Sequence, residues 1–200
     1  MTLLQSVEAM AVLVNAISGF IEARSKKMDV VGVFIVAFIT AFGGGTLRDI
    51  LLDKRPLFWV THQEYVILIF VLSLIAAPLI RTLRYIVSER LIIIADALGL
   101  GLLSIAGTSQ ALAAGMPLFV ASMMGVITGT FGGLLRDIVC NEIPMVLRDG
   151  RPYAACSFAG CWMYLLLEQS GVSPDLALWS SALTIFALRL WTWAKDIRIG

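Results

Sequence analysis

Long apolar segments alternate with short polar connections along the chain, and this pattern predicts helices. The segments are too long and too uniformly apolar to be strands of a membrane barrel. Residues 65–80 and 91–107 are near or above the length at which spanning helices are suspected. The pattern therefore predicts an all-α integral membrane protein with seven transmembrane helices, at roughly residues 5–23, 29–53, 64–82, 91–111, 117–140, 153–170 and 175–194.

The composition supports a membrane protein. Apolar residues make up 59% of the 200 positions and charged residues 14%, whereas soluble domains carry about 25% charged residues. The expected partner is the lipid bilayer, and a net charge of +1 gives no reason to expect a nucleic acid. Because no basic residue precedes the first apolar stretch, that stretch is expected to be a retained span and not a cleaved signal peptide.

Lysine and arginine residues are unevenly distributed among the connections, and this predicts the orientation. With the N-terminus outside and the C-terminus in the cytoplasm, 12 of the 15 basic residues fall on the cytoplasmic side. Cytoplasmic connections normally carry the excess of Lys and Arg, so this orientation is expected.

Two unusual motifs, FGGGTLRDI at 42–50 and TFGGLLRDI at 130–138, are related by an offset of 88 residues. A unit that crosses the membrane three times ends on the opposite side, so its copy must be inverted, as in many transport proteins. We therefore expect one membrane domain with an inverted 3+3 repeat and one extra helix. Its parts are residues 1–88, 89–172, and 173–200 for the seventh helix and tail.

The glycines Gly43, Gly44 and Gly45 fall inside the predicted second span. They follow about 20 Å of helix in a hydrocarbon core about 30 Å thick, and each Gly costs about 1 kcal/mol in a helix relative to Ala. Together with Gly132 and Gly133, they predict that the second and fifth helices are broken and kinked, with loosened backbone lining a watery cavity. The alternative is that the glycines serve only close helix packing.

Each glycine motif is followed by an Arg and an Asp, which are costly within a membrane unless they are paired. Adjacent helical residues point about 100° apart, so Arg48 is poorly placed to pair with its neighbour Asp49. If the two motifs meet near the repeat axis, Arg48 pairs with Asp137 and Arg136 with Asp49. The alternative is that each pair lies at headgroup level and caps a half-helix.

Hydroxyl side chains flank the glycines and occur on neighbouring spans. Broken half-helices suit cation handling because loosened carbonyls and hydroxyls replace the water around the ion. Each hydroxyl could equally bond its own backbone. The acids Glu8 and Asp96, also related by the repeat, either lead cations to the pore mouth or stabilise helix N-termini. The pore-lining candidates are Ser18, Thr40, Thr46, Ser104, Thr128 and Thr130.

No enzyme is expected from this sequence. A single His provides no metal or triad cluster, the His62–Glu64 pair lacks the cysteine pair of a deaminase, and no nucleotide-binding fingerprint occurs. No catalytic residue, resident metal or cofactor is therefore expected, and a permeant cation is the only ion expected. Cys140, Cys156 and Cys161 are expected to be packing residues.

The doubled glycine–Arg–Asp motif, the seven spans and the 3+3+1 repeat resemble the trimeric intracellular cation channel family, specifically its prokaryotic branch. The resemblance implies a bacterial or archaeal inner-membrane homotrimer with a pore in each protomer, lined by the kinked second and fifth spans. It implies permeation of monovalent cations, chiefly potassium, with sodium as a further candidate. It carries the motif roles onto Gly43–Gly45, Gly132–Gly133, Arg48, Asp49, Arg136 and Asp137.

The second motif departs from the first, because Phe131 stands where the first has Gly43. The fifth span is therefore expected to bend less, and Phe131 is a candidate pore plug. Bacterial relatives in this family have also been labelled as glycine transporters. A secondary transporter of a small neutral solute such as glycine is therefore the alternative, followed by a structural or accessory membrane protein.

Overall fold

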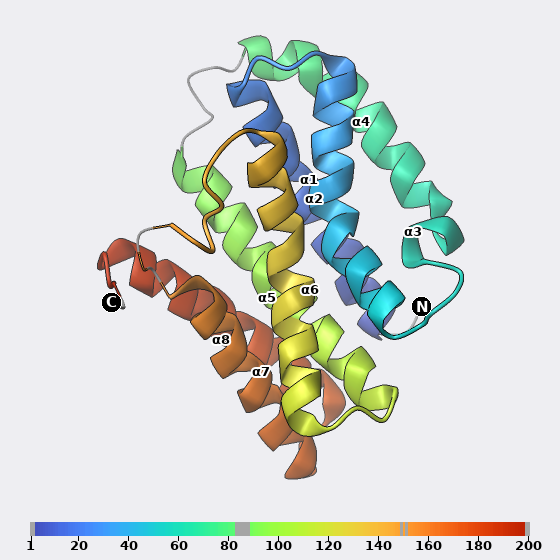
Figure 1. Ribbon diagram of the computed structural model, residues 1–200, viewed down its shortest axis with the longest axis vertical. Helices are drawn as coiled ribbons and strands as arrows, with labels where there is room; N and C mark the ends of the chain where they lie inside the picture. Colours follow the sequence, from blue (N-terminus) through green and yellow to red (C-terminus); the bar gives the residue numbers. More distant parts are fainter. Residues whose placement is uncertain (1–2, 83–88, 149, 151, 199–200) are drawn as a thin grey trace.

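The protein was analysed as a computed structural model that describes residues 3–82, 89–148, 150 and 152–198. Its regular structure is helical throughout these residues (Figure 1). The helices are α1 (Leu3–Ser25), α2 (Val30–Leu51), α3 (Phe58–Thr61), α4 (Gln63–Thr82), α5 (Glu89–Ala113), α6 (Leu118–Val139), α7 (Tyr153–Gln169) and α8 (Pro174–Ala194).

The predicted helical ranges agree with the structure. Each of the seven ranges coincides with one long helix, and every boundary lies within two residues of its prediction. The four-residue helix α3 was not predicted. By length and composition, four helices of the described chain are suited to crossing a membrane: α1, α2, α5 and α6. The repeat boundary is predicted between residues 88 and 89. Residues 83–88, which include Arg84, lie outside the described residues, and so does Arg151.

The helices pack as two groups joined at the centre of the molecule. The first group is α1, α2 and α4, with α4 along the outer side of α2. The second is α5 to α8, in which α5 and α6 face the first group and α7 and α8 lie at the opposite side of the molecule (Figure 1). One apolar core, which includes Val12 and Val36, fills the space among α1, α2 and α4. The other, which includes Leu100 and Ile185, is formed mainly by α5, α6, α7 and α8. Contacts of α1 with α5 and of α2 with α6 join the groups.

The two groups approach each other closely where α2 and α6 cross at their glycines. A Cβ atom on Gly44 would lie 1.9 Å from the carbonyl oxygen of Thr128, and one on Gly132 would lie 2.4 Å from that of Thr40. Real Cβ atoms do not come this close to backbone, so only Gly fits at these two positions. Because Thr40 faces Gly132 and Gly44 faces Thr128, the two helices run antiparallel through the contact.

The predicted break at the glycine motifs is wrong. Helix α2 continues unbroken from Val30 to Leu51, and α6 from Leu118 to Val139, so both motifs are helical. The glycines lower helix propensity, but close packing against a second helix compensates, since tertiary contacts routinely override propensity. The alternative interpretation, close helix packing, is therefore correct for Gly44 and Gly132.

Candidate functional site

The residues after the first glycine motif form a buried polar cluster, which we call the Arg48 cluster: Glu8, Arg48, Asp49 and Gln110. Arg48 is 2% exposed. Its Nη1 donates to Glu8 Oε1 at 2.7 Å, and its Nε and Nη2 donate to Asp49 Oδ1 at 2.9 and 2.7 Å. The Gln110 amide also donates to Glu8 Oε1, at 2.6 Å, and the Gln110 oxygen accepts from Lys54 Nζ at 2.7 Å. The cluster therefore joins α1, α2 and α5.

The second motif forms a matching Arg136 cluster: Ser18, Asp96, Arg136, Asp137 and Tyr153. The Nη1 of Arg136 donates to Asp96 Oδ1 at 3.0 Å and to the Ser18 hydroxyl, and its Nε donates to Asp137 Oδ1 at 2.9 Å. Its Nη2 lies 2.9 Å from the same Asp137 oxygen in an ion-pair contact. The Tyr153 hydroxyl donates to Asp96 Oδ2 at 2.7 Å. Each charge thus has an oppositely charged partner, which a buried ion requires.

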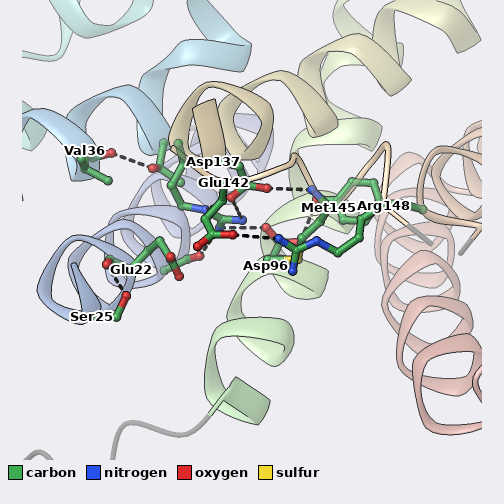
Figure 2. A network of polar contacts seen from close by, with 12 residues as sticks. Glu22, Ser25, Val36, Asp96, Asp137, Glu142, Met145 and Arg148 are labelled. Atoms are coloured by element: carbon green, nitrogen blue, oxygen red, sulfur yellow. Dashed lines mark hydrogen bonds and ion pairs between the residues drawn. The ribbon is translucent and has the colours of Figure 1, made fainter. Parts of the chain in front are cut away.

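In each motif, the second carboxylate oxygen of the Asp binds the backbone of the connection that follows the helix. Asp49 Oδ2 accepts from the backbone N–H of Phe58 at 2.9 Å, and Asp137 Oδ2 accepts from that of Met145 at 2.8 Å. The second of these bonds is visible in Figure 2. Each Asp therefore binds its own Arg through one oxygen and the following connection through the other.

The predicted cross-pairs between the motifs do not form within the described residues. Arg48 pairs with Glu8 and its own neighbour Asp49, and Arg136 pairs with Asp96 and Asp137. The α2–α6 contact lies at the glycines, and because the two helices are antiparallel there, the charges that follow lie on opposite sides of the crossing. The argument against pairing of neighbours was also wrong, since the long Arg side chain folds back to the adjacent carboxylate.

Most predicted hydroxyl ligands are occupied by the protein itself. Thr40, Thr128 and Thr130 each donate to the carbonyl four residues earlier, at 2.6, 2.6 and 2.8 Å. Ser104 bonds the hydroxyl of Ser157 at 2.7 Å, and Ser18 accepts from Arg136. In this conformation the alternative interpretation, bonding to backbone, therefore describes the three threonines.

Cavities adjoin the two clusters on either side of the crossing. One is lined by Thr46, Arg48 and Trp59, and a more open one beside it by Asp49 and Lys54. On the other side, Asp137, Arg148 and Arg189 contribute to a further cavity. The α2–α6 contact separates the two sides. Phe131 is half-buried next to Gly132 on α6 and lines none of these cavities.

A salt bridge connects two loops beside the Arg136 cluster. Lys26, which follows α1, pairs with Glu142, which also accepts from Arg148 at 3.0 Å (Figure 2). The bond from Lys26 holds the pKa of the Glu142 carboxyl below its ordinary value, and the same bond raises the pKa of Lys26. The salt bridge thus joins the loop after α1 to the loop after α6, beside the cavity that Glu142 lines.

Sequence reasoning missed the roles of Gln110 and Tyr153 and only partly found those of Glu8 and Asp96. The offset of 88 relates Glu8 to Asp96, and the same offset relates Arg48 to Arg136. These acids were the signal that could have identified the true partners of the arginines. The cysteines are free and buried, as expected for packing residues.

Two solved structures share this fold. The trimeric intracellular cation channel orthologue from Rhodobacter sphaeroides superposes with a TM-score of 0.88 at 29% identity, over 98% of this chain and 100% of that one. A prokaryotic TRIC channel solved in 0.5 M KCl superposes with a TM-score of 0.88 at 27% identity, over 98% of each chain. The fold and the apolar helices therefore define an integral membrane protein with the architecture of TRIC channels.

Sequence comparisons show the family. The sequence model of the family described as "Glycine transporter" matches twice, over residues 5–81 and 93–169. A UPF0126 membrane protein of Vibrio cholerae is 34% identical over 189 residues, 94% of this chain and 78% of that protein. The UPF0126 inner membrane protein YadS of Escherichia coli is 39% identical over 147 residues, 74% of this chain and 70% of that protein. The chain belongs to this family of bacterial membrane proteins, and none of the proteins compared is named as an enzyme.

Proposed function

We propose that the protein is a channel for monovalent cations, with a passage between α2 and α6 that is closed in the conformation described. The observation that carries this proposal is the pair of buried Arg–carboxylate clusters on either side of one glycine contact. That arrangement occurs in a chain that aligns along nearly its whole length with proteins named as cation channels.

The proposal includes an inverted repeat of three plus three helices with α8 added, which gives seven membrane crossings. Its support is the double match of one family model and the equivalent packing of the two halves. A Cβ atom on Gly19 of α1 would lie 2.9 Å from the Thr40 hydroxyl of α2, and one on Gly107 of α5 would lie 2.5 Å from the Thr128 hydroxyl of α6. Two units with the same contacts at the same offset are expected from a duplicated gene segment.

The charge of the two clusters favours cations. The Arg48 and Arg136 clusters contain four carboxylates, on Glu8, Asp49, Asp96 and Asp137, against two guanidinium groups. Each cluster therefore contains one more carboxylate than guanidinium, with Lys54 and Arg189 in contact with the two clusters, and carboxylates beside a passage raise the local concentration of cations. Potassium as the main ion, with sodium as a further candidate, rests on the family resemblance.

Opening requires α2 and α6 to separate at the glycines. Gly43, Gly45 and Gly133 lower the cost of bending there, because Gly accepts backbone conformations that other residues avoid. We propose that bending at the glycines frees the carbonyls of Thr40 and Thr128 to face the passage. Phe131 is then a candidate plug, since it sits one residue before the contact.

The proposed assembly is a homotrimer in the inner membrane, with a pore in each protomer. The trimer is inferred from the name of the R. sphaeroides channel, and the membrane from the name of the E. coli relative. The N-terminus is proposed to lie outside and the C-terminus in the cytoplasm, from the distribution of basic residues. In that orientation the Arg48 cluster faces outward and the Arg136 cluster faces the cytoplasm.

The second candidate is a transporter of a small zwitterion such as glycine, which the family description favours. Bilayer recording and uptake separate the two. The purified protein in a planar bilayer under a KCl gradient should give unitary currents that reverse toward the potassium equilibrium potential. Saturable uptake of labelled glycine into liposomes, without unitary currents, would instead support the transporter.

A charge-neutral variant with a matched control sharpens this test. Asp49→Asn removes one carboxylate of the Arg48 cluster and should reduce the cation conductance. Asp53→Asn makes the same chemical change four residues later, at an exposed position, and should conduct like the wild type. Equal conductance in both variants would count against a passage beside Asp49.

A further inference from the structure

The two clusters differ in the contacts of one tyrosine. Tyr153 bonds Asp96 within the Arg136 cluster and has Arg189 against its ring, and among the described residues the Arg48 cluster has no such tyrosine–acid bond. We infer that these two residues are positioning residues that hold Asp96 against Arg136 and thereby keep that end of the passage closed. This inference rests on the proposed cation channel, and it assigns part of the gating to α8, the helix outside the repeat.

Tyr153 acts on the side of Asp96 that faces away from Arg136. Its hydroxyl donates to Asp96 Oδ2 at 2.7 Å, while Asp96 Oδ1 pairs with Arg136 Nη1 at 3.0 Å. Tyr153 is 3% exposed and Asp96 4% exposed, so no bulk water can replace the hydroxyl in this conformation. A hydrogen bond to a buried charge is stronger than one between neutral groups, so Tyr153 fixes the carboxylate toward the guanidinium.

Arg189 acts on Tyr153 from α8. Its guanidinium carbon lies 4.6 Å from the centre of the Tyr153 ring, a distance typical of a cation–π interaction. Arg189 is 2% exposed, and within the described residues its Nε and Nη1 atoms have no hydrogen-bond partner. With these two donors unpaired, the face of the Tyr153 ring is one of the contacts that this buried charge makes. Arg189 therefore favours the ring position that reaches Asp96.

The other half of the molecule has the tyrosine but not this function. Tyr65 occupies the position 88 residues before Tyr153, and the described residues contain no bond from it to Glu8. Its ring instead stacks with Phe58 and contacts His62. Glu8 receives its second bond from the amide of Gln110. The tyrosine–acid bond and the arginine behind it thus occur on one side only.

The test compares the open probability of Tyr153→Phe with that of Tyr65→Phe in planar bilayers. Tyr153→Phe removes one hydroxyl and leaves Asp96 Oδ2 without its donor in the closed form. We expect the open-to-closed ratio to rise about tenfold, the effect of losing about one hydrogen bond to a charge. The current through each open channel should not change, because Tyr153 acts through Asp96. Tyr65→Phe should behave like the wild type.

Arg189 supplies the second arm of the experiment. Arg189→Met should raise the open-to-closed ratio, as Tyr153→Phe does. Arg189→Lys keeps a cation over the ring and should retain most of the wild-type gating. If Arg189→Met does not fold, Tyr153→Phe and Arg189→Lys still decide the question.

Three outcomes would overturn the inference: wild-type gating in Tyr153→Phe, an equal effect of Tyr65→Phe, or an altered unitary current. A wild-type protein without unitary currents would instead contradict the proposed channel itself.

Discussion

The Arg48 and Arg136 clusters use the same charged residues at equivalent positions, yet their surroundings differ. In both, an Arg pairs with the next residue and with an acid near the start of another helix. Around Arg48 the other partners are an amide, Gln110, and through it Lys54 beside an open cavity. Around Arg136 they are two buried hydroxyls. The two motifs thus form equivalent ion pairs, and residues outside the motifs make the surroundings of the two clusters different.

Removal of each arginine gives the largest expected effect and tests this difference. Arg136→Met leaves Asp96 and Asp137 buried without a cation, and breaking such a pair costs about 3–5 kcal/mol. Arg48→Met should cost less, about 1.5–3 kcal/mol, because both of its acids, Glu8 and Asp49, line an open cavity that water can enter, whereas Asp96 does not line the cavity beside the Arg136 cluster. Thermal unfolding of both purified variants in detergent checks the order, and a greater loss for Arg48→Met would contradict the comparison.

Alanine substitutions in the first glycine motif test the contact that holds the clusters apart. Gly44→Ala places a Cβ atom 1.9 Å from the Thr128 carbonyl oxygen, and overpacking of this kind costs about 1–3 kcal/mol. Gly45→Ala is the matched control, since its Cβ would meet only Arg48 Nη2 at 3.7 Å. It should leave the melting temperature unchanged or raise it slightly because Ala favours helix. Equal melting temperatures for the two variants would show that the helices do not touch at Gly44.

A smaller loss of stability is expected when the Gln110 amide, which belongs only to the Arg48 cluster, is removed. Gln110→Leu keeps a similar volume and removes one bond to Glu8 and one to Lys54. Because Arg48 still pairs with Glu8, the expected loss is about 1.5 kcal/mol, at the lower end for a hydrogen bond to a charged group. Chemical denaturation in mixed micelles measures it. A loss as large as that of Arg48→Met would mean that Gln110, and not the arginine, holds the cluster together.

The smallest effect concerns the loop salt bridge near the Arg136 cluster, and it depends on pH. Since Lys26 holds the pKa of Glu142 below its ordinary value of 4.5, the bridge stabilises the protein fully above that value. The contribution disappears as the pH falls through the lowered pKa, and it is small because both groups are exposed. Melting temperatures measured in acid should fall less steeply for Glu142→Gln than for the wild type. Parallel pH profiles would exclude the bridge as a contributor.

The helices were predictable because apolar length and polar punctuation are local signals. The repeat-related positions of Arg48 and Arg136 were also visible in the sequence. Whether the helices break or continue at the glycines was not predictable. The same glycines weaken an isolated helix and also permit a close crossing of two helices. Only the tertiary contact of Gly44 with Thr128 decides between a break and a packed helix.

The partners of the arginines were missed for a related reason. Their positions along the sequence were correct, but the expectation that both motifs meet at one point ignored the direction of the helices. Antiparallel α2 and α6 meet at Gly44 and Gly132 and then diverge, which carries Arg48 and Arg136 apart. Tyr153 and Gln110 belong to no sequence motif, so only the folded structure identifies them as members of the clusters.

Side-chain accessibility along α2 tests most directly whether cations pass between α2 and α6 beside the Arg48 cluster. Thr46 is half-buried and lines the cavity beside Arg48, whereas Ile50, one turn later, is 48% exposed on the outer surface. A cysteine-modifying cation is applied to Thr46→Cys and Ile50→Cys channels during bilayer recording. The wild type, whose three cysteines are buried, provides the baseline. We predict that modification reduces the current through Thr46→Cys and leaves that through Ile50→Cys unchanged, whereas an unaffected Thr46→Cys current, or equal block of both, would contradict this pathway.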